Sequence, residues 1–335
     1  MSNVVNSFPF VAEGTRAKVL RALQEVEYRP NAAAQNLRNG RTGLIGLVLP
    51  LNVQYFSELT DFVIQKATRR GLSVVIDKTD GDADREREFL LQGGRSVLFD
   101  GLIFSPAGLP EEEIHRLASR TPLVLLAAQP ASSSMLDHVL IDNVAAASAA
   151  TDHLLRLGRR RIALIGRSLD DRTGIAVDRV RGYRNALQAA GYPVDQSLVV
   201  DAQGFKREHG ARAMTRLLAL PAAPDAVFCY NDPLALGAMR TALSRGLRIP
   251  DDLAVVGFDD IEDGRFSTPT LSTIAQDKRQ IAHFAVDLLV QRINGRTGRG
   301  RTRIASWRLV ARESSSPGAT ESSTSRAEPA GTVHS

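Results

Sequence analysis

Residues 43–77, GLIGLVLPLNVQYFSELTDFVIQKATRRGLSVVID, place two short apolar runs on either side of an amphipathic stretch. The runs at 43–50 and 72–77 predict buried strands, and the spacing of apolar residues over 56–70 predicts a helix between them. Strands that are apolar on both faces and joined by a helix are typical of parallel sheets covered on both sides. The stretch therefore predicts an α/β fold built on doubly wound parallel sheets.

The same alternation of apolar runs and helical stretches continues to about residue 313. Further strands are predicted at residues 101–105, 122–126, 139–142, 161–166, 198–201, 226–230 and 253–257. Some nine or ten strands are too many for one ordinary open sheet, so we expect two similar lobes. Ligands in such sheets bind beyond the carboxyl ends of the strands, so the loops there should line a cleft between the lobes.

The expected division into lobes follows from residues 158–161, where a basic turn precedes a new strand and the chain is expected to cross between lobes. A second crossing is expected near Gln276. The first lobe is then expected to comprise residues 43–158 and 277–303, and the second lobe residues 159–276 and 304–313.

The two ends of the chain differ from this body. Residues 1–42 carry no strand signal, only helical patterns at 13–26 and 31–38. The second pattern is rich in alanine and begins at an asparagine that can cap it, but about two turns of helix are too short to be stable alone. Something outside this helix must therefore stabilise it. The tail 314–335 is polar and rich in Ser, Thr, Pro and Gly, a composition that predicts disorder.

Composition and motifs argue against several classes of protein. The 335 residues carry a net charge of +5, which permits nucleic-acid binding without requiring it, and one cysteine, Cys229. The sequence contains neither an apolar run of about 18 residues nor a secretion signal, so we expect a cytoplasmic protein without a membrane partner. Nucleotide-binding, nucleophile-elbow and zinc motifs are absent and the six histidines are scattered. We therefore expect no enzyme, no cofactor and no metal site.

The segment before the first strand matches a known pattern. Residues 4–50, VVNSFPFVAEGTRAKVLRALQEVEYRPNAAAQNLRNGRTGLIGLVLP, resemble the join between headpiece and core in the LacI/GalR family of bacterial transcription regulators. Residues 2–6 resemble the latter part of the recognition helix, 11–26 the third helix and 32–38 the hinge helix. The resemblance extends to about residue 313. It implies a periplasmic-binding-protein-like (type I) core, preceded by a partial helix-turn-helix headpiece (1–30) and a hinge helix with its linker (31–42).

The resemblance also implies contacts with DNA. In the family, the paired hinges of a dimer wedge a leucine into the minor groove, and Leu37 occupies that position here. Arg38 and Arg41 would contact phosphates. The alternatives are a core-facing leucine and a solvated linker charge. The implied DNA-binding residues are Ser2, Asn3, Asn6, Asn31, Ala34, Leu37 and Arg38.

The beginning of the sequence departs from the family pattern. A helix-turn-helix domain needs its first helix to hold the recognition helix in the major groove, and roughly 15 to 20 residues carrying that helix are missing here. One hypothesis is that the reading frame begins upstream and that Met1 stands where the family has a valine. The alternative is a truncated paralogue, in which we expect DNA binding to be lost.

Loop residues of the body match the positions at which the family binds its small-molecule effector. Arg179 precedes a Gly-Tyr pair by three positions, as the family's effector-binding arginine does, and Asp259 resembles the carboxylate that binds effector hydroxyls. The expected effector-binding residues are Tyr55, Phe56, Arg179, Phe205, Asn231, Asp259 and Gln276. Tyr55 or Phe56 could instead pack internally, and Gln276 could bond across the hinge. Asp232 is expected to cap a helix.

The resemblance implies a repressor that acts as a homodimer on a pseudo-palindromic operator, with an effector bound between the lobes. Charged, amide and aromatic groups in one cleft suit a sugar or sugar derivative, and they also admit a purine or nucleoside. The alternative is a periplasmic-type sugar-binding protein without DNA-binding function. Whether the effector releases DNA or promotes binding is left open by the sequence.

Overall fold

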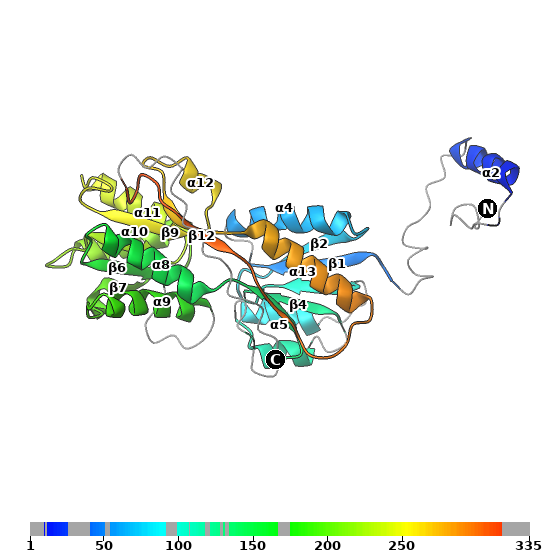
Figure 1. Ribbon diagram of the computed structural model, residues 1–335, viewed down its shortest axis with the longest axis horizontal. Coiled ribbons are helices and arrows are strands. Elements are labelled where there is room, and N and C mark those ends of the chain that lie inside the picture. The colour runs from blue at the N-terminus through cyan, green and yellow to red at the C-terminus, as the bar shows by residue number, and fades with distance from the viewer. Residues whose placement is uncertain are drawn as a thin grey trace.

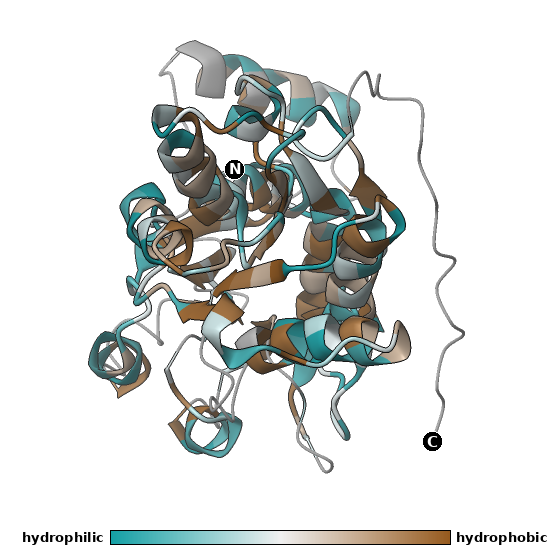
Figure 2. Ribbon diagram, turned by 90° about the vertical axis from the view of Figure 1, so that its left-hand side faces the viewer, coloured by the Kyte–Doolittle hydropathy of each residue, from teal (hydrophilic) through white to brown (hydrophobic). Residues whose placement is uncertain are grey.

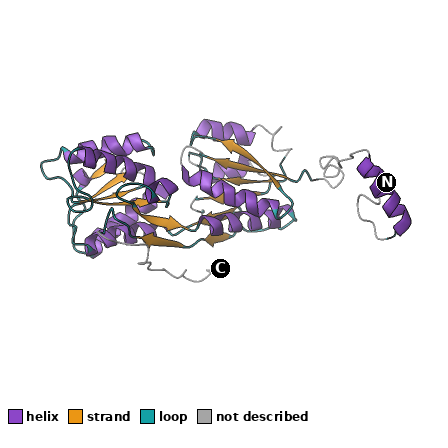
Figure 3. Ribbon diagram, turned by 90° about the horizontal axis from the view of Figure 1, so that it is seen from above, coloured by secondary structure: helices purple, strands orange, loops and turns teal. Residues whose placement is uncertain are grey.

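The computed structural model describes residues 10, 12–25, 41–50, 54–91, 99–106, 108–117, 121–127, 130, 134–166 and 175–316. Before the body, α2 (Glu13–Glu25) confirms the helix predicted at 13–26. The body consists of two lobes that lie side by side, each a sheet between helices (Figures 1 and 3). Among the described residues, no helix is both long and apolar enough to cross a bilayer.

The first lobe contains a parallel sheet in the order β11-β5-β4-β3-β1-β2. Its strands are β1 (Leu44–Leu49), β2 (Ser73–Lys78), β3 (Gly101–Phe104), β4 (Leu123–Leu126), β5 (Asp137–Leu140) and β11 (Thr302–Ile304). Helices α4 (Gln54–Thr68) and α13 (Lys278–Ile293) pack together on one face, and α5 (Ala83–Leu91) and α7 (Glu111–Leu117) cover the other. Alternate residues of each strand therefore join different cores. Leu47 lies under α4 and α13, whereas Val48 joins the opposite cluster.

The second lobe repeats this plan in the order β12-β10-β9-β8-β6-β7. Its strands are β6 (Ile162–Gly166), β7 (Val199–Asp201), β8 (Ala226–Cys229), β9 (Ala254–Phe258), β10 (Ser272–Gln276) and β12 (Trp307–Val310), with β12 antiparallel to β10. Helices α8 (Asn143–Arg156) and α9 (Ile175–Ala189) cover one face. Helices α10 (Arg207–Leu218) and α11 (Asp232–Ser244) cover the other, and α12 (Glu262–Arg265) follows β9. Apolar residues gather between the layers (Figure 2).

The observed fold is the predicted α/β class, with differences in detail. Strands β10, β11 and β12 were not among those predicted. Helix α8 packs against α9 and against strands of the second sheet, so the chain crosses between lobes before Asn143 and not at 158–161. Two further crossings join β10 to α13 and β11 to β12, and Ile304 belongs to the first sheet instead of the second lobe. Ser314 and Ser315, assigned to the disordered tail, are buried, and Oγ of Ser314 donates to the Val255 carbonyl at 2.7 Å.

Candidate ligand-binding site

The seven predicted effector-binding residues lie where strands end and helices begin. Tyr55 and Phe56 are in the first turn of α4, and Gln276 ends β10. Asn231 and Asp259 follow β8 and β9 by a few positions, Phe205 follows β7, and Arg179 lies in α9. Since the carboxyl ends of neighbouring parallel strands share one edge of a sheet, this placement brings the residues of the second lobe together.

One chain of hydrogen bonds joins the two lobes. The Nε2 atom of Gln276 donates to Oδ1 of Asp259 at 2.7 Å, and the hydroxyl of Tyr55 donates to Oε1 of Gln276 at 3.3 Å. Tyr55 belongs to the first lobe and Asp259 to the second, so Gln276 bridges them. This is the hinge bond that the sequence left as one alternative for Gln276.

Arg179 is held in place by several partners at once. Its Nε donates to Oδ1 of Asn143 at 3.0 Å, and its Nη1 donates to the main-chain oxygen of Tyr230. The guanidinium carbon lies 3.5 Å from the centroid of the Phe258 ring and 4.4 Å from that of Tyr230. Only 5% of Arg179 is exposed, and its Nη2 lies 4.0 Å from Oδ1 of Asp259. Arg179 therefore presents a buried, oriented positive charge beside a buried carboxylate.

The electrostatics of the site centre on Asp259, which is 6% exposed. Burial raises the pKa of Asp259 to about 6, although the positive charges of Arg179 and Lys278 and the hydrogen bond from Gln276 oppose this change. Burial likewise raises the pKa of the Tyr55 hydroxyl, which thus remains a neutral hydrogen-bond donor. The site can accept hydrogen bonds at Asp259 and donate them from Arg179, Gln276 and Tyr55.

The aromatic residues divide between the two lobes. The rings of Phe205 and Tyr230 lie 5.0 Å apart with an interplanar angle of 35°. Tyr55 and Phe56 meet edge to face at 5.1 Å, and both pack against the core of the first lobe. The internal packing that was an alternative for Tyr55 and Phe56 is thus observed, while the Tyr55 hydroxyl still reaches Gln276.

Of the adjacent pair Asn231 and Asp232, the asparagine caps the helix. Asn231 caps α11, since its Oδ1 accepts from the Leu234 amide at 3.0 Å, and its Nδ2 donates to the Phe205 carbonyl at 3.1 Å. Asp232, expected to be the cap, is fully buried and accepts from the hydroxyl of Thr273 at 2.7 Å. The expected cap role of Asp232 is therefore wrong.

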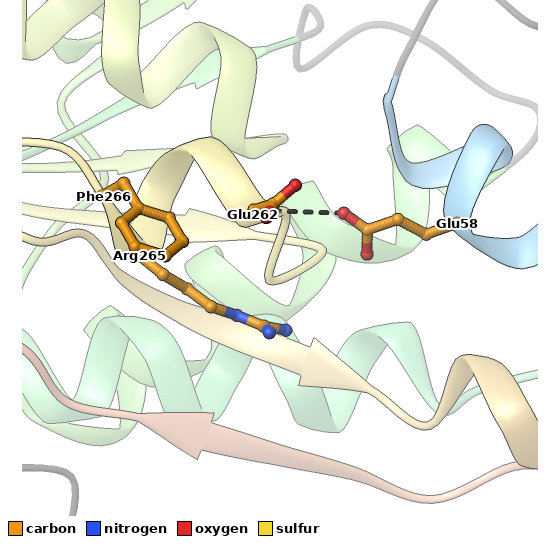
Figure 4. A pocket seen from close by; sticks show the side chains of 4 residues that line it. All are labelled: Glu58, Glu262, Arg265 and Phe266. Carbon is orange, nitrogen blue, oxygen red and sulfur yellow. Dashed lines mark hydrogen bonds between the residues drawn. The ribbon is translucent and has the colours of Figure 1, made fainter.

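The two lobes are also joined by contacts that were not predicted from the sequence. Glu58, one turn after Tyr55 on α4, accepts from the Glu262 amide at 3.1 Å and pairs with Lys278. Lys278 in turn donates to the main-chain oxygen of Asp260 at 3.0 Å. A pocket of about 580 Å³ opens beside these contacts, lined by Glu58, Glu262, Arg265 and Phe266 (Figure 4). This lining contains none of the seven predicted residues.

Other functional residues were missed or cannot be placed. Asn143, the acceptor for Arg179, comes from the helix that the sequence assigned to the first lobe, so no local signal pointed to it. Phe258, whose ring contacts Arg179, directly precedes Asp259 in the sequence and could have been predicted from that position. The seven implied DNA-binding residues lie outside the described part of the chain. Within the described residues, no group of three or more His, Cys, Asp or Glu side chains could hold a metal ion.

The described core begins at a segment anchored to the first lobe. Arg41 donates from Nη1 to Oδ1 of Asn294 at 2.9 Å and from Nη2 to the Ile293 carbonyl at 2.8 Å. The carboxylate of Asp100 accepts from the amides of Thr42 and Gly43 at 2.7 and 2.8 Å. The entry into the core is thus fixed to the carboxyl end of α13.

Comparison with known proteins identifies the family. Residues 151–315 match the periplasmic binding protein-like domain family. The ribose operon repressor of Haemophilus influenzae is 34% identical over 315 residues, covering 94% of this chain and 93% of that protein. A putative LacI-family transcriptional regulator from Sanguibacter keddieii has 43% identity and a TM-score of 0.76, covering 83% of this chain and 100% of that one. A complex of the transcriptional regulator CelR with cellobiose has 30% identity and a TM-score of 0.73, covering 93% and 94%.

Two parallel-sheet lobes with polar and aromatic groups gathered at their junction define a periplasmic-binding-protein-like (type I) ligand-binding core. The chain belongs to the LacI/GalR family of bacterial transcription regulators. Its relatives are transcriptional repressors and regulators, not enzymes.

Proposed function

We propose that this protein is a repressor whose operator affinity is controlled by a sugar or sugar derivative bound between its lobes. The single observation that carries the proposal is the chain Tyr55–Gln276–Asp259, with Arg179 beside it, which joins both lobes through buried and half-buried polar side chains. A ligand that enters here must replace hydrogen bonds given and accepted by these groups. Vicinal hydroxyl groups do both, and aromatic rings offer faces to the apolar side of a sugar.

The names of two similar proteins support a sugar as the effector. One similar structure holds cellobiose, and one relative is named for a ribose operon. The tilted pair of rings of Phe205 and Tyr230 offers an aromatic surface to a purine base as well, so a nucleoside is the second candidate. In either case all seven expected residues, Tyr55, Phe56, Arg179, Phe205, Asn231, Asp259 and Gln276, are proposed to line or support the site.

Helix α13 supports a physical link between this site and DNA. It begins at Lys278, in the contacts that join the two lobes, and ends at Ile293, where Arg41 is bound. A change in the relative position of the lobes would move both ends together, because a helix shifts as a rigid unit. We propose that a homodimer uses this movement to order or release its hinge helices on a pseudo-palindromic operator in the cytoplasm. A coupling of about 1–3 kcal/mol would then act in both directions.

The experiment that tests this function has two stages. Thermal unfolding is first measured with cellobiose, D-ribose, adenosine and hypoxanthine, each against buffer. A ligand at 100 times its Kd should add about 2.7 kcal/mol of stability. Fluorescence anisotropy then compares promoter fragments with bulk DNA, with and without the stabilising compound. An effector-dependent preference for one fragment is expected. Sugar binding without any preference among DNA fragments would contradict the repressor and fit either the truncated paralogue, in which DNA binding is lost, or the periplasmic-type alternative.

The raised pKa of Asp259 predicts a pH-dependent affinity. The ionised carboxylate accepts hydroxyl donors, and its pKa is about 6 in the unliganded protein. Affinity for the sugar should therefore be constant above about pH 7 and fall by up to about tenfold per unit below pH 6, as the carboxylate is protonated. Titration calorimetry from pH 5 to pH 8 measures this. Asp259→Asn should bind weakly and nearly independently of pH; a pH dependence that survives in this variant would assign the titration to another group.

A further inference from the structure

The turn that carries Asp259 has an unusual backbone. Asp259 has a φ of 114° and Asp260 a φ of 51°, so two consecutive residues with side chains adopt positive φ. Non-glycine residues in such conformations are strained, and they persist only where the surroundings determine them. The structure must therefore contain groups that hold this turn.

Three cationic side chains from three different elements bind Asp260. Arg312, which follows β12, donates to its Oδ1 at 2.7 Å, and Arg265 of α12 donates to its Oδ2 at 2.9 Å. Lys278 of α13 donates to its main-chain oxygen at 3.0 Å. These contacts fix both the side chain and the backbone of Asp260. We call Asp260, Arg312, Arg265 and Lys278 the clamp.

The carboxylate of Asp232 also holds this turn through hydrogen bonds. Its Oδ2 accepts from the Ile261 amide at 2.9 Å, and its Oδ1 accepts from Thr273. A Cβ atom at Gly257 would lie 2.2 Å from that Oδ1, so a glycine is needed there to admit the Asp232 side chain. Asp260 and Ile261, the two residues after Asp259, are thus anchored, while the Asp259 carboxylate is directed to Arg179 and Gln276.

Arg312 and Asp260 form a buried ion pair. Their side chains are only 6% and 8% exposed. A buried ion pair usually contributes little net stability, because desolvation of both charges offsets their attraction. It does impose one geometry, since a planar guanidinium binds along fixed directions; Arg312 also donates from Nη1 to the Leu271 carbonyl at 2.8 Å.

We propose that Asp260 and Arg312 are positioning residues for the small-molecule site: they hold the strained turn that aims the Asp259 carboxylate at Arg179, without touching the effector. The inference rests on the proposed function for its effect on sugar binding. Its geometric part concerns the unliganded protein and is tested without any ligand.

The test uses Arg312→Lys, which keeps the charge and shortens the reach of the donors. The carboxyl carbon of Asp259 is followed by ¹³C NMR in the unliganded full chain over pH 4 to 8, and its signal is identified by its loss in Asp259→Asn. The wild-type carboxyl should titrate near pH 6. In Arg312→Lys the released carboxylate should gain water and titrate closer to the ordinary value of about 4. An unchanged titration would overturn the inference.

Controls separate positioning from general loss of structure. Arg308→Lys, an exposed arginine of β12, should leave the Asp259 titration unchanged. If Arg312→Lys fails to fold, Arg265→Met takes its place, since Arg265 is 46% exposed and also binds Asp260. The Asp259 signal in Arg265→Met should move in the same direction by a smaller amount, and an unmoved signal would count against the clamp.

A double-mutant cycle with cellobiose and D-ribose tests the effect on binding. Arg312→Lys should weaken binding of the sugar by about tenfold in the wild-type background and have no further effect in Asp259→Asn, because both changes act through one carboxylate. Equal losses in both backgrounds would overturn the inference. If Asp259→Asn leaves sugar binding unchanged, the proposed site itself is wrong, while the ligand-free titration still decides whether the clamp positions Asp259.

Discussion

Replacing Arg179 with alanine should weaken effector binding by about 100-fold or more. The change leaves the Asn143 amide oxygen and the Tyr230 carbonyl without their donor, and it removes the positive charge nearest to Asp259. Removing one partner from a buried, hydrogen-bonded set of charges costs about 3–5 kcal/mol. Part of this cost will appear in the free energy of unfolding. The rest should appear in titration calorimetry with the sugar identified by thermal unfolding.

A matched control lies two positions along the same helix. Arg181 pairs with Asp178, but its side chain is 58% exposed, so Arg181→Ala should change affinity by less than about twofold. Arg179→Lys should also lose most of the affinity, since an ammonium group cannot bind Asn143 and Tyr230 in the same plane. Sedimentation velocity should show the same oligomer for all three variants. Wild-type affinity in Arg179→Ala would refute the site.

Gly237→Ala should destabilise the second lobe, whereas the same change inside most helices is stabilising. A Cβ atom at Gly237 of α11 would lie 1.9 Å from the carbonyl oxygen of Arg207 in α10. The neighbouring Gly210 meets the Leu234 carbonyl just as closely, at 2.0 Å, so the two helices touch through their glycines. Overpacking of this kind costs about 1–3 kcal/mol, against a propensity gain of about 1 kcal/mol for alanine.

The direction of the change in the free energy of unfolding tests this close approach of the two helices. Urea unfolding should give a lower midpoint for Gly237→Ala, and Gly237→Val should be worse because its side chain is larger. Arg240→Ala, at an exposed position of the same helix, should stay within about 0.5 kcal/mol of the parent. A stabilised Gly237→Ala would mean that α10 and α11 do not approach each other as described.

Most of the strands that the sequence predicted are those whose burial is evident from composition, although β2 is largely exposed and the buried β10 was missed. Strands such as β1 and β9 are buried along nearly their whole length, so nearly all of their residues are apolar. Strand β11 has three residues, all exposed, and β12 has four, of which only Val310 is buried. Such short edge strands are defined by the partner that they pair with, so no local pattern announces them.

The site shows a similar division. Arg179 and Asp259 were assigned from their matches to family motifs. Several residues around them match no such motif and could not be assigned. Asn143, Glu58 and Lys278 reach the site from elements far apart in the sequence. In the pair Asn231 and Asp232, both side chains suit a helix cap. Only the position of Thr273 and of the Ile261 amide selects the asparagine for that role.

The sequence by itself determined the α/β class, the two lobes and the family, because hydrophobic periodicity and motif order are local properties of a chain. Only the tertiary structure decided that α8 belongs to the second lobe, that Gln276 bridges Tyr55 and Asp259, and that Arg312 binds Asp260. These features depend on groups separated by up to some two hundred positions. These polar contacts become strong only when folding buries several of the groups together and removes their water. This condition produces no periodic pattern in the sequence.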